Sequence, residues 1–208
     1  MLDQRLATRV ENFVSRLKRE SVCMHGFILD VRGEVKATAY YPPFEEGKAH
    51  RMYSVSKSMT ALAIGLLLDE GKISLDDRIA DYFRDFLPEK PDARLMRLKI
   101  RDMLRMATCY RATVYRETDD DWTKPFFTAA STHEPGTVFH YDTGCSQVLA
   151  ALVALVALSA YFSATETAFS SLSTAKMRTL AEQGDRRAEL ALRLHGQYDR
   201  LISTILIG

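Results

Sequence analysis

The amino-acid sequence predicts an α+β fold, with α/β as the alternative, because two segments with strand character and several helical segments precede residue 142. The composition supports a folded domain, since 47% of the 208 residues are hydrophobic and 26% are charged. This composition excludes disordered, collagen-like and disulfide-rich chains, and the length suffices for a sizeable core. The net charge of +1, from 28 basic and 27 acidic side chains, gives no reason to expect a nucleic-acid partner.

The first 41 residues predict a helix followed by a hairpin. Residues 3–20 place apolar side chains on one helical face and charged side chains on the other. Residues 27–29 and 35–41 are apolar or β-favouring, and Arg32-Gly33 lies between them as a turn. The N-terminal residues are charged and contain no apolar core of a secretory signal.

Four further segments complete the part before residue 142. Residues 54–70 predict a long apolar helix, which Gly71 ends. Ser74 is expected to cap a short helical stretch that begins at Ile73. Residues 100–106 predict another helix, and residues 111–137, which are rich in charge and threonine, predict a loop.

An uncharged run of 23 residues, 143–165, interrupts the even distribution of charge. As a helix it would span roughly 35 Å, at about 1.5 Å per residue, which is enough to cross a bilayer and contact lipid. The alternative is a buried core helix, because Gln147 and two serines dilute the run. Residues 173–194 then predict one amphipathic helix, and residues 201–208 begin a second apolar segment on which the chain stops.

The candidate nucleophile is Ser54, which together with Lys57 fits the pattern S-x-x-K. Residues i and i+3 share a helix face, so the lysine amine can reach the serine hydroxyl and accept its proton. The pattern alone is weak, since 14 serines and 9 lysines give roughly 0.6 matches by chance. Ser54 stands out because it follows the strand pair and begins the most apolar helix before residue 142. The two other matches are expected to be exposed helix residues: Ser15–Lys18 and Ser173–Lys176.

Three blocks of sequence resemble the serine β-lactamase-related hydrolases of the class C and penicillin-binding esterase type. They read RMYSVSKSMTALAIGLLLDEGKISLDDRIADYF, LKIRDMLRMATCY and EPGTVFHYDTGCSQVLAALV, and the resemblance covers about residues 20–153. It implies that Ser54 is acylated, that Lys57 accepts its proton, and that Tyr141 relays the proton to the leaving group. Thr143 stands where the family's Y-x-N motif has asparagine, which weakens the expected hydrogen bond to a substrate amide. Without the resemblance, Tyr141 would be interpreted as a buried aromatic residue.

The resemblance also implies an incomplete β-lactamase/transpeptidase-like domain over residues 1–150. The family's third motif, K/H-x-G, is not matched after Tyr141, and losing one oxyanion-hole donor typically costs about 100- to 1000-fold in rate. We therefore expect a truncated serine hydrolase, weakly active or inactive, that takes a small ester, amide or lactam and needs no cofactor.

A second resemblance is expected to define a segment over residues 151–208. LSAYFSATETAFSSLSTAKMRTLAEQGDRRAELALRLHGQYDRLISTILIG is similar to the start of the transmembrane domain of CNNM/CorC-type magnesium and cation transporters. Ser159, Ser163 and Glu166 match its S-x-x-x-S-x-x-E pattern, and oxygen ligands suit Mg²⁺. The alternative for Glu166 is that it marks the membrane edge.

Together the two resemblances predict a fusion of two gene fragments. The expected location is the membrane, crossed once, with the cytoplasm as the alternative. Basic residues after the run favour a cytoplasmic position for that side, which would leave the hydrolase part outside. A membrane fragment of a transporter and a non-catalytic fusion product are the alternatives to the hydrolase.

Overall fold

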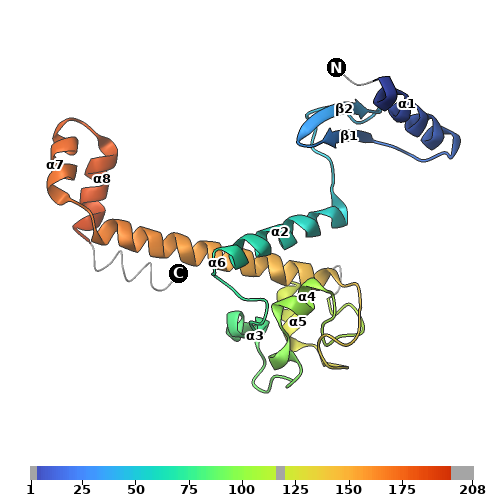
Figure 1. Cartoon of the computed structure of the whole chain (residues 1–208). Helices are drawn as coiled ribbons and strands as arrows, with labels where there is room; N and C mark the ends of the chain where they lie inside the picture. The colour runs from blue at the N-terminus through green and yellow to red at the C-terminus, as the bar shows by residue number, and fades with distance from the viewer. Residues whose placement is uncertain (1–3, 116–119, 198–208) are drawn as a thin grey trace. The chain divides into compact units, whose positions relative to one another are not determined.

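The computed structural model describes residues 4–115 and 120–197 and divides the chain into two compact units (Figure 1). The first unit is Met1–Tyr53 and the second is Ser54–Gly208. We describe each unit by itself.

The first unit is a helix and a two-stranded hairpin. Helix α1 (Gln4–Arg19) is followed by the antiparallel strands β1 (Gly26–Val31) and β2 (Glu34–Tyr40). Arg32 and Gly33 form the two-residue turn with positive φ values of 58° and 81°, the geometry that suits the twist of a hairpin. The predicted first helix and hairpin are confirmed to within two residues at each boundary.

Helix α2 (Ser56–Asp69) begins the second unit and follows a short 3₁₀ turn, η1 (Tyr53–Val55). The predicted helix over 54–70 is therefore confirmed, although its first two residues belong to the 3₁₀ turn. Gly71 has φ of +65°, and the amide of Lys72 donates back to the Leu67 carbonyl. This left-handed residue after the last turn ends the helix as predicted.

Two expectations about the middle of the chain are wrong. Ser74 caps no helix: its Oγ accepts the amide of Asp76 within a turn, and the next helix, α3 (Ile79–Tyr82), starts later. The segment 111–137 is not wholly a loop, because it contains helix α5 (Thr123–Thr128), whose two phenylalanines are buried. The predicted helix over 100–106 is confirmed as α4 (Ile100–Leu104). The short 3₁₀ turns η2 (Arg84–Phe86) and η3 (Leu95–Arg97) lie between α3 and α4.

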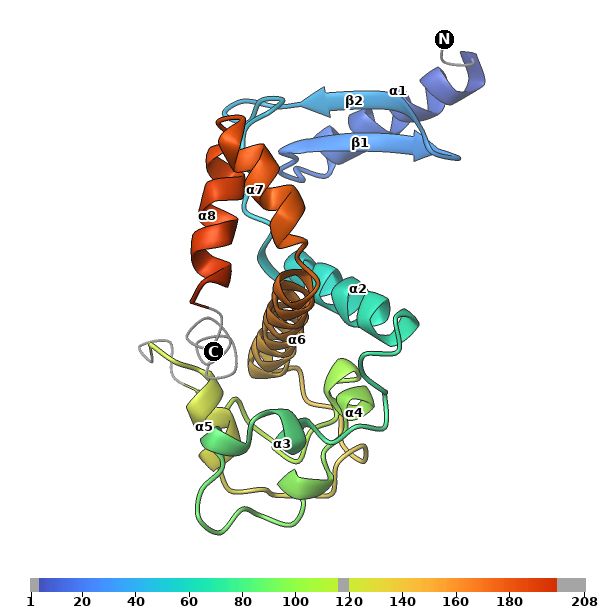
Figure 2. The ribbon, with the colours of Figure 1, turned by 90° about the vertical axis from the view of Figure 1, so that its left-hand side faces the viewer.

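Helix α6 (Thr143–Ser170) organises the core of the second unit. It packs against α2, α4 and α5, and Figure 2 shows it running beside α2. The core cluster consists of these buried residues: Ile64, Ile73, Ile79, Phe83, Leu95, Leu98, Ile100, Met103, Cys109, Tyr110, Phe126, Phe127, Cys145, Val148, Leu149 and Leu152. Burying such side chains is the main favourable contribution to folding.

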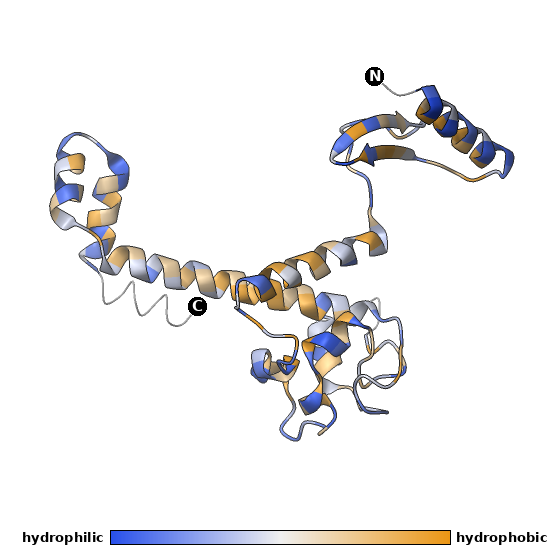
Figure 3. Ribbon diagram, in the orientation of Figure 1, coloured by the Kyte–Doolittle hydropathy of each residue, from blue (hydrophilic) through white to orange (hydrophobic). Residues whose placement is uncertain are grey.

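The two halves of α6 differ in environment. Its buried residues all lie between Gly144 and Leu152, whereas Leu155, Leu158 and Tyr161 are 45–65% exposed. Figure 3 shows apolar residues along both α2 and α6. Among the described residues, α6 is the one helix long and apolar enough to cross a bilayer. Of its most apolar stretch of 18 residues, 17% is buried. The first half is thus a core helix, and a membrane contact by residues 143–165 stays a prediction.

The segment after α6 forms two helices where the sequence predicts one. Helix α7 (Thr174–Glu182) and helix α8 (Arg186–His195) are separated by Gly184, whose φ is +91°, and by Asp185. The Asp185 carboxylate accepts the first amides of α8, so a new helix starts there. The predicted apolar segment 201–208 lies outside the described residues.

Candidate active site

The predicted nucleophile and its lysine meet at the N-terminal end of α2. Ser54 lies exposed in η1, and Lys57 lies in the first turn of α2. The Nζ atom of Lys57 donates a hydrogen bond of 3.1 Å to Ser54 Oγ. The three-residue spacing on a helical segment therefore brings the two groups together as the pattern predicts.

Tyr141 joins this pair from a position 87 residues along the chain. Its hydroxyl donates to Ser54 Oγ at 2.7 Å, and Lys57 Nζ lies 5.3 Å from the centre of its ring. Hydrogen bonding with Ser54, and next with Lys57, lowers the pKa of Tyr141 from its usual value. Tyr141 is 51% exposed, so the alternative of a buried aromatic residue is wrong.

The segment that leads to Tyr141 is held by backbone hydrogen bonds to residues 106–109. These bonds come at nearly regular intervals, so the segment follows one fixed path over the unit. The amides of Thr132, Gly136 and His140 donate to the carbonyls of Cys109, Ala107 and Met106, at 2.8, 2.7 and 2.9 Å. The last bond fixes the residue directly before Tyr141.

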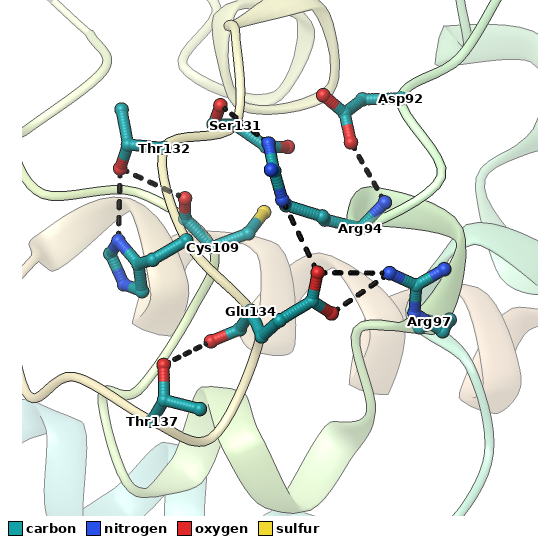
Figure 4. A network of polar contacts seen from close by, with 9 residues as sticks. Asp92, Arg94, Arg97, Cys109, Ser131, Thr132, Glu134 and Thr137 are labelled. Atoms are coloured by element: carbon teal, nitrogen blue, oxygen red, sulfur yellow. Dashed lines mark hydrogen bonds and ion pairs between the residues drawn. The ribbon is translucent and has the colours of Figure 1, made fainter.

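Side chains reinforce the same segment (Figure 4). Both carboxylate oxygens of Glu134 accept hydrogen bonds from Arg97, at 3.1 and 2.8 Å, and one also accepts from Arg94 at 3.3 Å. Arg94 also donates to the Ser131 carbonyl, and the Thr137 hydroxyl donates to the Glu134 carbonyl. The arginines, which lie at η3, thus hold the segment before Tyr141 from a second side.

Sequence reasoning missed Asp142, the residue that follows Tyr141. It is 1% exposed, and its carboxylate accepts the amide of Gly144 at 3.0 Å, which caps α6. Burial is the main cause that raises the pKa of Asp142 above its usual value. An aspartate directly before a long uncharged run is an N-cap signal that could have identified it.

The two other S-x-x-K pairs do not gather around a third group in this way. Ser15 and Lys18 lie exposed on α1. Ser173 caps α7, where its Oγ accepts the backbone amide of Lys176 at 3.4 Å. Both are helix-surface residues, as expected.

The predicted cation ligands lie on the second half of α6. Ser159 and Ser163 are exposed and line a hollow of about 490 Å³ with Lys72 and Tyr82, and Glu166 is half-buried further along the helix. Within residues 4–115 and 120–197, no group of three His, Cys, Asp or Glu side chains could hold a metal ion. The magnesium site stays a prediction.

Solved structures share the fold of this chain over about half of their own length. One is described as "Putative 6-aminohexanoate-dimer hydrolase from Bacillus anthracis", with a TM-score of 0.54 and 18% identity over 68% of this chain and 42% of that chain. Another is described as "Crystal structure of putative beta-lactamase from Bacteroides dorei DSM 17855", with a TM-score of 0.57 and 16% identity over 72% and 46% of the two chains. At these identities the likeness shows the fold alone, a β-lactamase/transpeptidase-like fold.

A curated relative is similar in sequence over a shorter segment. The 6-aminohexanoate-dimer hydrolase of Paenarthrobacter ureafaciens is 35% identical over 77 residues, which is 37% of this chain. This segment amounts to 19% of the relative, and the chain spans less than half the length of the two solved structures.

A family model settles the wider relationship. The model for the beta-lactamase family matches residues 26–187. This match continues past residue 151, where the transporter-like segment was expected to begin, so the resemblance to CNNM/CorC transporters and the fusion of two genes find no support. The chain belongs to the beta-lactamase family.

Proposed function

We propose that the chain is a serine hydrolase in which substrates acylate Ser54. The observation that carries the proposal is the convergence on one oxygen: Lys57 Nζ at 3.1 Å and Tyr141 Oη at 2.7 Å both contact Ser54 Oγ. A serine hydroxyl is a weak nucleophile until a neighbouring base accepts its proton. Two titratable neighbours at hydrogen-bond distance supply a base and a proton relay.

The proposed reaction moves one proton through this group. Lys57, in its neutral form, accepts the proton of Ser54 as Oγ bonds to the substrate carbonyl carbon. The tetrahedral intermediate then collapses, the bond to the leaving amine or alcohol breaks, and Tyr141 gives its hydroxyl proton to that leaving group and takes the proton held by Lys57 in its place. Water attacks the acyl-enzyme by the reverse sequence, which releases the acid and restores the Ser54 hydroxyl. No step needs a metal or cofactor.

The proposed substrates are small amides and esters, with a lactam as the runner-up. We favour a linear amide, because the relative that is 35% identical over 77 residues is named a 6-aminohexanoate-dimer hydrolase. Thr143, which stands at the asparagine position of the family motif, donates and accepts through one hydroxyl oxygen, where an asparagine amide would donate and accept through two separate atoms.

Covalent labelling tests the proposal without requiring turnover. The purified chain is incubated with a fluorescent fluorophosphonate and, separately, with a fluorescent penicillin, and the labelled peptide is identified by mass spectrometry. We expect label on Ser54 and none on the Ser54→Ala variant. Ser15→Ala and Ser173→Ala are matched controls, because these serines occupy the same S-x-x-K spacing. No label on the wild type, or equal label on Ser54→Ala, would refute the proposal.

A further inference from the structure

Tyr141 lies between two fixed points of the backbone. On one side, the amide of His140 donates to the Met106 carbonyl at 2.9 Å. On the other side, the Asp142 side chain accepts the Gly144 amide at 3.0 Å and caps a helix of 28 residues. That helix is in turn fixed in the core by Cys145 and the buried residues of its next two turns.

The Asp142 carboxylate is held in a place that is costly for a charge. The residue is 1% exposed, and its Oδ2 atom has no hydrogen-bond partner within the described residues. A buried side chain with one unsatisfied oxygen costs folding free energy. Such a residue is a candidate for a role beyond stability.

The Asp142 carboxylate lies close against the backbone of Gly144. A Cβ atom added to Gly144 would lie 3.2 Å from Oδ2 and 3.4 Å from Oδ1. The charged and titratable groups that interact with it are His140, Lys57 and Cys145. The carboxylate therefore occupies one defined position beside the group formed by Ser54, Lys57 and Tyr141.

We propose that Asp142 is a positioning residue, whose cap on α6 holds the Tyr141 hydroxyl at hydrogen-bond distance from Ser54. The proposal rests on the proposed function, because it concerns the same acylation step. Without the cap, the residues from Tyr141 to Gly144 lose one of their two anchors, and the 2.7 Å contact between Tyr141 and Ser54 is no longer enforced. Loss of geometry at a reacting group lowers rate strongly even when the fold persists.

The test compares two substitutions at this position. Asp142→Asn keeps a side-chain oxygen that can cap the helix, and Asn is as good an N-cap as Asp. Asp142→Ala removes the acceptor. We expect the rate of Ser54 labelling to fall about tenfold or more in Asp142→Ala and to stay within about threefold of wild type in Asp142→Asn. Equal losses in both variants would overturn the cap as the cause.

A double-mutant comparison shows whether Asp142 acts through Tyr141. In a Tyr141→Phe background the hydroxyl is already gone, so Asp142→Ala should cause little further loss. A full additional tenfold loss would overturn the proposal. Asp185→Ala is the matched control, because Asp185 caps α8 in the same way, and it should leave labelling unchanged. Melting curves of all variants test whether the fold persists.

The outcomes separate this proposal from the proposed function. Label that persists on Ser54→Ala refutes the proposed function itself. Label that depends on Ser54 but forms equally fast in Asp142→Ala refutes only the role of Asp142.

Discussion

A pair of tyrosine-to-phenylalanine substitutions should separate the chemistry of the site from the stability of the fold. Tyr141→Phe removes the hydroxyl that donates to Ser54 Oγ at 2.7 Å. Because a positioned proton-transfer group typically contributes 10²- to 10⁴-fold, we expect labelling of Ser54 to slow by about 100- to 10,000-fold. Tyr141 is 51% exposed and its ring remains in the variant, so the free energy of unfolding should change by no more than about 0.5 kcal/mol.

Tyr110→Phe should have the opposite effect. The Tyr110 hydroxyl donates to the Phe126 carbonyl at 2.5 Å, and both residues are almost fully buried. Removing it leaves a buried carbonyl without its partner, which costs about 1–3 kcal/mol. In a chain of this size each kcal/mol lowers Tm by about 2–4 °C, so Tm should fall by about 2–12 °C. The group formed by Ser54, Lys57 and Tyr141 is unchanged in this variant, so the rate of Ser54 labelling below Tm should equal that of the wild type.

Both variants are measured by the same two assays, the time course of labelling by the fluorescent penicillin, whose departing nitrogen needs a proton, and a thermal melt. We expect Tyr141→Phe to lose labelling rate and keep its stability, and Tyr110→Phe to lose stability and keep its labelling rate. A Tyr141→Phe variant that labels at the wild-type rate would refute the role of its hydroxyl. A Tyr110→Phe variant that slows labelling at a temperature where it is fully folded would refute the separation of core from site.

Three further predictions address the fold. Ile64 is fully buried on α2 and Leu62 is 60% exposed on the same helix. Ile64→Ala should lower the free energy of unfolding in urea by about 2–5 kcal/mol, whereas Leu62→Ala should change it by no more than about 0.5 kcal/mol. Similar costs for the two variants would contradict the packing of α2. Hydrogen bonding and charge from Arg97 lower the pKa of Glu134. The stabilising contribution of Glu134 is therefore present above its unfolded pKa and is lost as pH falls through the lower folded value. Glu134→Gln should weaken the acid dependence of Tm below about pH 4.5, and an unchanged dependence would count against the ion pairs. If α6 spans a bilayer, expressed protein stays in the membrane pellet after carbonate extraction, and complete release into the supernatant would exclude the span.

The sequence allowed the local part of the site to be predicted and left the long-range part to a resemblance. Ser54 and Lys57 are three residues apart on one helical segment, so their contact follows from helix geometry. Tyr141 is 87 residues from Ser54, and no periodicity relates two positions so far apart. Its contact depends on the fixed path of residues 131–140, which is a property of tertiary packing.

The errors in the predicted elements have local causes. Helix α5 was missed because Thr123–Thr128 contains a proline and lies among charged and threonine-rich residues. Burial of its two phenylalanines in the core holds the helix in place. The single helix predicted over 173–194 is two, because apolar spacing continues across a break that Gly184 and Asp185 mark. The transporter-like boundary near residue 151 rested on an alanine- and leucine-rich run that also fits the core of a beta-lactamase-family domain.

The unequal burial of α6 separates the dynamics of its two ends. Beyond Val156, which still packs against the core, the helix is supported mainly by its own hydrogen bonds, and such segments open and close with small free energies. Fraying from the C-terminal end can thus run through many turns and stop where the packed residues begin. Amide hydrogens past Val156 should exchange with solvent quickly, whereas those near Cys145 should exchange only when the whole unit opens. The tyrosine at the other end is thereby insulated from motion in the exposed half of its own helix.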